Sequence, residues 1–385
     1  MAFDVVVVGA GIVGASVAYH ATLRGLRVMV LDARGLASGA SGSCDGFICM
    51  QTKAPGPHLR LAARSACLLA ALASDIGLDY RPQGVLVIMG TWAEREVMET
   101  RRRDLAAEGV PVEMIEGRQL ALEEPILKGG DFVGASLSLR DGTVDPIQLT
   151  YLFARAASRN GAILRFHSPA IAIRTSHGRV TGVETTGGLI PCGSVVVAAG
   201  LGTGNILRSC GLHLPVRAVR GQLLVSEPLG VVGRPMVDAR YIALKHNPGL
   251  LSTLTPHGVP AEVGFGVEQS ACGNLLIGNT REPGAGSNGT SLEALEGICR
   301  NAARIAPGLR HVRIIRAFAG LRPYGPDSLP FVGSVGDVEG LYLAGGMGGD
   351  GITLSAAAGA GLARMLTGEE SPELAPFSPC RFRLD

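Results

Sequence analysis

The sequence predicts an α/β protein with more than one domain, and three observations support this prediction. The chain has 385 residues, more than a single hydrophobic core usually supports. It opens with an apolar strand pattern, a glycine-rich turn, a helix pattern and a second strand pattern. A second glycine-rich turn leads into a helix pattern near residue 350, close to the other end of the chain.

Composition and charge exclude several classes of protein. Hydrophobic residues make up 46% of the chain and charged residues 18%, which predicts a packed core and not a disordered chain. The formal net charge of +2 gives no electrostatic basis for a nucleic-acid partner. The basic run Arg101–Arg103 has acids on both sides, which is typical of a solvated helix face. The eight cysteines form no C-x-x-C pair, which predicts reduced thiols and no metal site.

No segment is predicted to target the chain to a membrane. The N-terminus lacks the basic region of a signal peptide. The apolar stretch Leu341–Ala363 carries one charge, at Asp350, but it is too rich in glycine to favour a membrane helix. We therefore expect a cytoplasmic protein with no transmembrane segment.

The first motif is a strand, a glycine-rich turn, a helix and a second strand. Residues Phe3–Val8 form an apolar β-branched run, and Gly9-Ala10-Gly11-Ile12-Val13-Gly14 follows at once. The helix pattern stops near Gly25, and the second strand pattern, Leu26–Leu31, ends at Asp32. This order is typical of a Rossmann-like dinucleotide-binding domain.

Each conserved part of such a motif has a physical role, which we assign to the residues here. Gly9 permits the tight turn, Gly11 lets a pyrophosphate approach the backbone, and Gly14 lets helix and strand pack closely. The helix N-terminus directs unpaired N–H groups at the phosphates. Asp32 is placed to accept hydrogen bonds from an adenosine ribose. The alternative is a glycine-rich turn without a ligand, and the motif alone does not separate FAD from NAD.

Two later segments favour a flavin. The loop Gly39–Phe47 is rich in small and hydroxyl residues, which suit a close approach to the pyrophosphate and ribityl chain, although a flexible surface loop would look similar. The run Asp141–Pro146 precedes a helix pattern over Gln148–Arg159, and a buried strand pattern follows at Val195–Gly200.

A third segment is the most informative, because it joins the run Gly320–Gly333 to the glycine-rich run Gly340–Leu354. With the earlier segments it resembles the D-amino-acid-oxidase-like superfamily of FAD-dependent oxidoreductases, over nearly the whole chain. The resemblance implies an FAD-binding domain of the glutathione-reductase type and an α+β substrate domain on a mostly antiparallel sheet. It also implies that Arg322 holds a substrate carboxylate through its planar guanidinium, with a structural salt bridge as the alternative.

The second glycine-rich turn resembles the one whose helix faces the flavin pyrimidine, where a helix N-terminus stabilises the negative charge of the reduced ring. Asp350 is expected to point away from the flavin or to cap this helix, since its charge would repel an anionic ring. The motifs and the resemblance together predict a set of FAD contacts. They are Gly9, Gly11, Ile12, Val13, Gly14, Asp32, Ala33, Ala40, Ser41, Asp45, Gly46, Phe47, Ala170, Ala199, Gly200, Met347, Gly348, Gly349, Asp350, Gly351, Ile352 and Thr353.

Within the superfamily the chain is most similar to the β-subunits of proline, D-hydroxyproline and opine dehydrogenases, on Cys44–Phe47, Gln51-Thr52-Lys53 and Gly348–Ile352. This implies electron-accepting partner subunits carrying FMN or iron–sulfur clusters, through which the protein would lie at the inner membrane. Met347 departs from the histidine common in the family, which puts the flavin potential and oxygen reactivity in doubt. The Arg322 motif contains no cysteine, so we expect non-covalent FAD.

The predicted domains are discontinuous. We expect the FAD-binding domain at residues 1–80, 141–225 and 315–370, the substrate domain at 81–140 and 226–314, and an irregular tail at 371–385. Within the substrate domain we predict strands at Gly84–Met89, Tyr241–Lys245 and Leu275–Ile277, a helix at Ser291–Ile305 and an insertion at Pro248–Cys272.

The predicted reaction is oxidation of the C–N bond of a small amino or imino acid of the proline, hydroxyproline, opine, sarcosine or glycine type. Tyr241 and His246 are candidates to line the pocket beside Arg322, with a core or surface role as the alternative. No strong catalytic base is expected, because desolvation and positioning of an uncharged amine can suffice. The alternatives are a glycine or D-amino-acid oxidase that uses oxygen, a non-catalytic FAD-binding subunit of a multimeric dehydrogenase, and an NAD-dependent enzyme.

Overall fold

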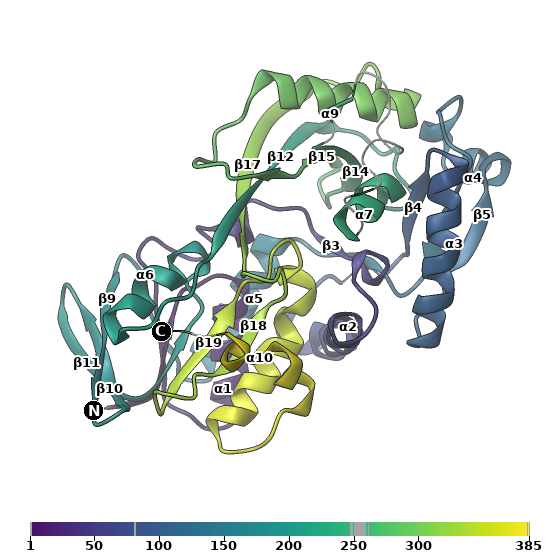
Figure 1. The fold of residues 1–385 in the computed structure, drawn as a ribbon. Helices are drawn as coiled ribbons and strands as arrows, with labels where there is room; N and C mark the ends of the chain where they lie inside the picture. The colour runs from purple at the N-terminus through teal and green to yellow at the C-terminus, as the bar shows by residue number, and fades with distance from the viewer. Residues whose placement is uncertain are drawn as a thin grey trace.

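The computed structural model describes residues 2–80, 82–246, 249, 259–260, 262–382 and 384, without the side chains of Lys245 and His246. Two large sheets organise this part of the chain, and helices pack on both of them (Figure 1). The mixed α/β architecture with a parallel and a mostly antiparallel sheet confirms the predicted fold class.

The first sheet has a parallel centre. Its strands are β1 (Phe3–Val8), β2 (Val28–Leu31), β8 (Ile163–Arg165), β9 (Ala170–Ser176), β10 (Arg179–Thr185), β11 (Gly188–Val197), β18 (Phe331–Ser334) and β19 (Leu341–Gly345). Strands β19, β11, β1, β2 and β8 are parallel in this order, while β18 is antiparallel to β19. Strand β1 is buried and rich in valine, as expected where both faces of a parallel sheet are covered.

Four helices pack around this sheet. They are α1 (Ile12–Leu23), α2 (Pro57–Ile76), α5 (Pro146–Arg159) and α10 (Gly351–Leu366). Helix α1 lies between α5 and α10 and is buried almost all round, so it shows no amphipathic pattern. Gly359 brings α10 close to α1, where the Ser16 hydroxyl donates a 2.9 Å hydrogen bond to the Ser355 carbonyl.

The second sheet is mostly antiparallel. Its strands are β4 (Val85–Met89), β5 (Glu113–Glu116), β6 (Gly134–Ser138), β12 (Arg217–Pro228), β13 (Met236–Asp238), β14 (Val263–Gln269), β15 (Asn274–Thr280), β16 (Glu282–Pro283) and β17 (Ile314–Tyr324). Helix α9 (Leu292–Ile305) packs on it through a buried stripe that includes Ala294, Ile298 and Ile305. Helix α3 (Trp92–Ala107) lies near β4.

Shorter elements complete the described chain. They are the strands β3 (Phe47–Ile48) and β7 (Gly142–Thr143), the helices α4 (Gly117–Glu123), α6 (Thr203–Leu207) and α7 (Ala239–His246), and the 3₁₀ turns η1 (Ala40–Gly42), η2 (Met50–Thr52), η3 (Pro125–Leu127), η4 (Gly200–Gly202), η5 (Arg208–Cys210), η7 (Pro307–Leu309), η8 (Pro372–Phe377) and η9 (Pro379–Arg381).

Two long paired strands connect the regions of the two sheets. Strands β12 and β17 pair antiparallel from Arg217 opposite Tyr324 to Ser226 opposite Ile314, and they run from one region to the other (Figure 1). Tyr324, at the end of β17, forms a bridge with Met347, just before α10 begins. Arg322, which belongs to the second sheet, therefore lies near the start of α10, a helix that packs on the first sheet.

One sequence prediction about an element is wrong. The predicted strand Tyr241–Lys245 is part of helix α7, where the Asp238 carboxylate accepts a 3.0 Å hydrogen bond from the backbone N–H of Tyr241, as helix N-cap side chains do. The predicted insertion at 248–272 lies partly outside the described residues, and its described part includes strand β14. The tail contains the short turns η8 and η9, and Leu374 and Phe377 of η8 are buried.

Candidate active site

A cavity of about 630 Å³ lies between the two sheets. Its wall includes the turn after β1, the loop before β3, the end of β17 and the turn before α10. Most of the predicted FAD contacts line it. They are Gly9, Gly11, Ile12, Val13, Asp32, Ala33, Ala40, Ser41, Asp45, Phe47, Ala170, Ala199, Gly200, Met347, Gly348, Gly349, Asp350, Gly351 and Ile352.

The turn after β1 leaves backbone donors open to the cavity. Gly9 has φ +113°, and a Cβ there would lie 2.4 Å from the Ala198 carbonyl oxygen, so a larger residue would push β1 and β11 apart. Helix α1 has no side-chain cap from Gly11, and the N–H of Ile12 donates to the Ser41 hydroxyl at 3.0 Å. The positive end of α1 therefore faces the cavity, where it suits a phosphate.

The Asp32 carboxylate at the end of β2 is held by backbone donors. It accepts hydrogen bonds from the N–H groups of Ala10 and Arg34, both at 2.8 Å, and of Gly35 at 3.0 Å. These contacts fix the first turn against the loop that follows β2. Asp32 also lines the cavity, at the place where the sequence motif predicts a ribose.

The second glycine-rich turn forms a neighbouring part of the wall, where Gly351 lies next to Ile12. A Cβ on Gly348, which has φ +55°, would overlap the Tyr324 ring, and the Gly348 N–H donates to the Pro323 carbonyl at 2.8 Å. Helix α10 begins at Gly351 without a side-chain cap, so its N-terminal donors also face the cavity. Met347 is buried at this turn.

Asp350 forms a buried ion pair. Its side chain does not cap α10, although a cap was one of the two predicted arrangements. Its Oδ1 lies 2.8 Å from the Lys53 Nζ, and its Oδ2 lies 3.4 Å from the His58 Nε2. The Lys53 side chain is only 3% exposed. The Lys53 ammonium therefore offsets the negative charge that would otherwise stand at this helix end.

Arg101 positions the segment that carries Lys53, which corrects the prediction of a solvated face for this arginine. Its guanidinium is buried and donates to the carbonyls of Gln51 at 2.9 Å and Lys53 at 2.7 Å. Burial lowers the pKa of Arg101, although Asp104 and Cys49 oppose this. The neighbouring Arg102 is exposed and pairs with Glu99.

These features fit FAD. The cavity has two neighbouring helix N-termini without a side-chain cap from Gly11 or Asp350, a glycine turn whose Cβ positions are already filled by backbone, and a volume typical of a cofactor site. The helix α1 end would hold the pyrophosphate, Asp32 the ribose side, and the α10 end the flavin pyrimidine.

Arg322 on β17 lines the same cavity. Its Nη1 donates to the Thr280 carbonyl at 2.8 Å and lies 3.4 Å from the Arg220 carbonyl. A Cβ on Gly221 would overlap the guanidinium, and Gly349 lies against its Cδ and Nε. No acid of the described chain lies within ion-pairing distance of it. The predicted alternative of a structural salt bridge is therefore not observed within these residues.

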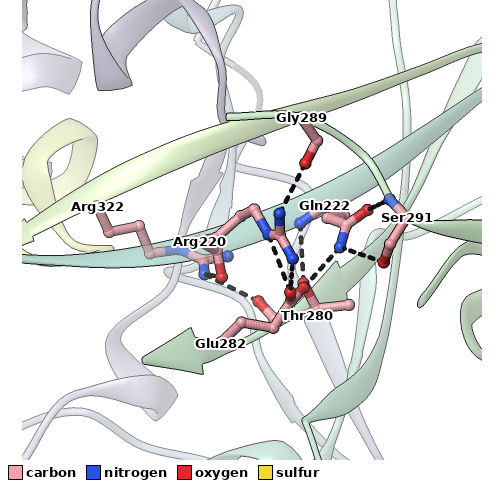
Figure 2. A network of polar contacts seen from close by, with 7 residues as sticks. All are labelled: Arg220, Gln222, Thr280, Glu282, Gly289, Ser291 and Arg322. Atoms are coloured by element: carbon pink, nitrogen blue, oxygen red, sulfur yellow. Dashed lines mark hydrogen bonds and ion pairs between the residues drawn. The ribbon is translucent and has the colours of Figure 1, made fainter. Parts of the chain in front are cut away.

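A polar network fixes the two carbonyls that hold Arg322 (Figure 2). Glu282 pairs with Arg220 and accepts hydrogen bonds from Gln222, at 2.7 Å, and Thr280. Burial alone would raise the pKa of Glu282, but these hydrogen bonds lower it, so the carboxylate stays charged. Glu282 offsets the charge of Arg220. No described acid does the same for the neighbouring Arg322, so its charge remains available to a ligand.

A second guanidinium lies beside two tyrosines at the cavity. Arg281 lies 4.8 Å from the centroid of the Tyr324 ring, and its Nη1 donates to the Tyr324 hydroxyl at 2.5 Å. Tyr241 is also close enough to Arg281 to raise the pKa of the guanidinium. Both tyrosines line the cavity, so the predicted lining position of Tyr241 is observed although it lies on a helix.

Four of the predicted site residues are not among the described residues that line the cavity. Gly14 packs against the Gly9 carbonyl, and the Gly46 N–H donates to the Glu268 carboxylate at 2.8 Å. The Thr353 hydroxyl is buried and donates to the Phe47 carbonyl at 3.2 Å. The side chain of His246 lies outside the described residues.

Other residues at the site were missed by the sequence predictions. Lys53, Asn279 and Tyr324 line the cavity, and Arg281 lies behind it. The sequence offered a signal for Lys53 alone, because it lies just after a loop already assigned to the flavin. Asn279 and Arg281 lie at the end of β15, and only the pairing of β15 with β12 brings them to β17.

Comparison with known proteins assigns the family. The family model of the FAD-dependent oxidoreductases named DAO matches residues 4–365, almost the whole chain. The chain belongs to this family. The protein is thus an FAD-dependent oxidoreductase, which confirms the predicted resemblance and cofactor and excludes a purely NAD-dependent enzyme.

Similar proteins match along their whole length. Glycine oxidase of Geobacillus kaustophilus is 28% identical, over 98% of this chain and 97% of its own. Hydrogen cyanide synthase subunit HcnC of Pseudomonas aeruginosa is 27% identical, over 99% and 96%. The structure of iminodiacetate oxidase from Chelativorans sp. BNC1 aligns with a TM-score of 0.81 at 27% identity, over 97% and 98%.

Helices able to cross a bilayer were sought in the described ranges, and none is long and apolar enough. In the same ranges, no cluster of three or more His, Cys, Asp or Glu side chains is arranged to hold a metal ion.

Proposed function

We propose that this enzyme oxidises the C–N bond of a small amino or imino acid that carries a carboxylate. The observation that supports this most strongly is Arg322, which faces the FAD cavity with its charge unpaired among the described residues. When bound, FAD supplies the acceptor for a hydride at flavin N5. The product would be an imine, which water hydrolyses or which remains within a ring.

The residues of the chain would bind and orient the substrate. The anchored Nη1 of Arg322 leaves its other nitrogens to form a bidentate contact with a carboxylate. Tyr324 and Tyr241, both beside Arg281, would form the polar wall of the substrate space. The buried pair of Lys53 and Asp350 would keep the α10 end of the cavity free of net negative charge.

The names of similar proteins guide the choice of substrates. Relatives named for glycine and iminodiacetate support a small carboxylated amine, and the proline, hydroxyproline, opine and sarcosine types remain candidates. The test is an anaerobic titration of the FAD-loaded enzyme with each of these compounds while flavin absorbance is followed. At least one carboxylated amine should bleach the flavin, and its decarboxylated analogue should not. Bleaching by no carboxylated amine would contradict the proposal.

The electron acceptor is a separate question. The relative named as a subunit of hydrogen cyanide synthase supports a dehydrogenase that passes electrons to a partner, whereas the relatives named as oxidases support direct use of oxygen. Admission of air to the bleached enzyme distinguishes these functions. Recolouring within seconds identifies an oxidase, and a flavin that stays reduced until an artificial acceptor is added identifies a dehydrogenase.

We further propose that FAD is held without a covalent bond. No cysteine lies in the Arg322 segment. Cys44 and Cys49 line the cavity, and burial raises the pKa of both thiols well above the usual value. A neutral thiol is a poor nucleophile. Acid precipitation of the holoenzyme should therefore leave all flavin in the supernatant.

A further inference from the structure

The loop before β3 brings a carboxyl group into the substrate end of the cavity. Asp45 lines the cavity together with Asn279 of β15, which is close enough to Asp45 to lower the pKa of its carboxyl. The loop is held in place on both sides of Asp45. The Gly46 N–H donates to Glu268, and the Gly320 backbone packs against the Ser43 carbonyl so closely that a Cβ would overlap it. Asp45 is therefore held against β15 and β17, the strands that also position Arg322.

Asp45 and Arg322 present opposite charges to one cavity without pairing. Each contributes to the electrostatic environment of the other, yet no ion pair joins them within 4 Å. The Nη1 of Arg322 is instead anchored to the carbonyls of Thr280 and Arg220. An α-amino acid carries an anionic and a cationic group on one carbon. Such a zwitterion is the ligand whose charges complement this arrangement.

We propose that Asp45 contacts the amino group of the substrate and accepts a proton from its ammonium form. This inference rests on the proposed function. An N–H bond of the ammonium breaks and an O–H bond forms on Asp45, which leaves a neutral amine with a free lone pair. The lone pair then forms the C=N bond as the hydride leaves the α-carbon. The substrate is oxidised by two electrons, and bound FAD is reduced. Asp45 would thus supply the base that the sequence did not lead us to expect.

The groups around Asp45 suit a proton acceptor. Burial raises its pKa, while Arg322, Asn279 and Lys53 oppose this rise, and Asp350 adds to it. Within the described residues, Cys44, next in the chain, Glu268, which holds the Gly46 N–H, and Asp145 are further titratable groups near this loop. A carboxyl whose pKa lies nearer neutrality than that of an exposed aspartate is a more effective base near pH 7.

The test compares the holoenzyme with Asp45→Asn and with Asp337→Asn, a change at an exposed aspartate. In Asp45→Asn, kcat/KM for the best carboxylated amine should fall roughly 10²- to 10⁴-fold at pH 7, as expected for loss of a general base. The loss should shrink as pH rises toward the pKa of the substrate ammonium, because the free amine then needs no base. Asp337→Asn should keep the wild-type pH profile.

A binding measurement separates this role from a structural one. Perturbation of the flavin spectrum by acetate, which has a carboxylate and no amine, should give a Kd within about threefold of wild type in Asp45→Asn. Asp45→Glu should restore part of the lost activity, because it restores a carboxylate. A wild-type pH profile in Asp45→Asn, failed rescue by Asp45→Glu, or loss of FAD or of acetate binding in Asp45→Asn would overturn the inference. Failure of the proposed function looks different, because the wild-type flavin would then not bleach at all.

Discussion

At the scale of single residues, the site depends on which charges are already neutralised by the protein. Glu282 neutralises Arg220 and Lys53 offsets Asp350, so the two charges in each of these ion pairs compensate each other. Among the described residues, Arg322 and Asp45 are opposite charges that face the proposed substrate end of the cavity without an ion pair between them. Buried charges are costly without partners, and a site that retains them is therefore built for a charged ligand.

Replacement of Arg322 tests its role as the carboxylate clamp. Arg322→Ala should lower kcat/KM for the carboxylated substrate by about 30- to 1000-fold, mainly through KM, since losing such a charged contact costs on the order of 2–4 kcal/mol. Arg322→Lys should give an intermediate loss, because it keeps the charge but lacks the planar fork. Steady-state kinetics measures kcat and KM, with Arg310→Ala, a change at an exposed arginine, as control. An unchanged KM in Arg322→Ala would show that Arg322 does not bind the substrate carboxylate.

Single residues also mark how far sequence reasoning reached. Gly9, Gly11 and Asp32 could be predicted because their roles follow from a local order of strand, turn and helix. Arg322 could be predicted only through the family resemblance. The pair of Lys53 and Asp350 spans almost 300 positions of sequence, and the contact of Arg281 with Tyr324 depends on strand register, so no local pattern indicates either.

At the scale of elements, the packing of α1 between α5 and α10 positions the first glycine turn. His20 lies in this packing, with its ring edge-on to Tyr19 and tilted against Phe153, and its Nε2 has no hydrogen-bond partner in the described chain. Burial, with smaller effects of Arg24 and Arg364, lowers the pKa of His20 from 6.5 to about 4. The folded protein thus keeps this imidazole neutral where an unfolded chain would protonate it.

This burial predicts a loss of stability in acid. As pH falls from about 6.5 to about 4, the unfolded state binds a proton that the folded state does not, so His20 contributes to the decrease in the free energy of unfolding. A shift of this size corresponds to on the order of 3 kcal/mol. Chemical denaturation at pH 7 and pH 4 should show a smaller decrease for His20→Leu than for wild type. The exposed His311→Gln should behave as wild type, and an equal decrease for His20→Leu would contradict the assignment.

The contact between α1 and α10 allows a second prediction at this scale. In Gly359→Ala the new Cβ would lie 2.8 Å from the Ser16 carbonyl carbon, so the two helices must move apart. Overpacking of this kind costs roughly 1–3 kcal/mol, which outweighs the gain of up to about 1 kcal/mol in helix propensity. Urea denaturation should show net destabilisation, with Gly286→Ala, at an open position, as control. Net stabilisation would mean that α1 and α10 accommodate the added methyl group without overpacking.

Elements also account for the wrong predictions. The apolar run Tyr241–Lys245 is too short for its periodicity to separate a strand from a helix, and the deciding contact is the Asp238 carboxylate that starts α7. Arg101 was assigned to a solvated face from its charged neighbours, but one position in that run points inward at the carbonyls of Gln51 and Lys53. Tertiary contacts decided both cases.

At the scale of the whole molecule, the fold brings two glycine-rich turns from opposite ends of the chain to one cavity. Strand β19 pairs with β11, and β11 with β1, so the turn before α10 and the turn before α1 lie at the same edge of the sheet. The class of each domain could be predicted from sequence. The predicted boundary between residues 225 and 226, however, falls inside the continuous strand β12, because that strand serves both regions.

Because the segments proposed to contact FAD come from both ends of the chain, its binding should stabilise the whole fold. FAD at 100 times its Kd should add about 2.7 kcal/mol to the free energy of unfolding. Thermal unfolding of the apoprotein with increasing FAD should therefore show one transition that moves to higher temperature. Two transitions, with only one responding to FAD, would show that the two regions unfold independently.

The central claim is that one cavity holds both FAD and an amino acid whose C–H bond breaks there. The most direct test is anaerobic rapid mixing of the holoenzyme with the best substrate from the titration and with its α-deuterated form, while flavin absorbance is followed. Bleaching should be complete in both cases, with a slower rate for the deuterated compound. Bleaching at the same rate with both compounds, or a flavin that stays oxidised with every carboxylated amine, would contradict the central claim.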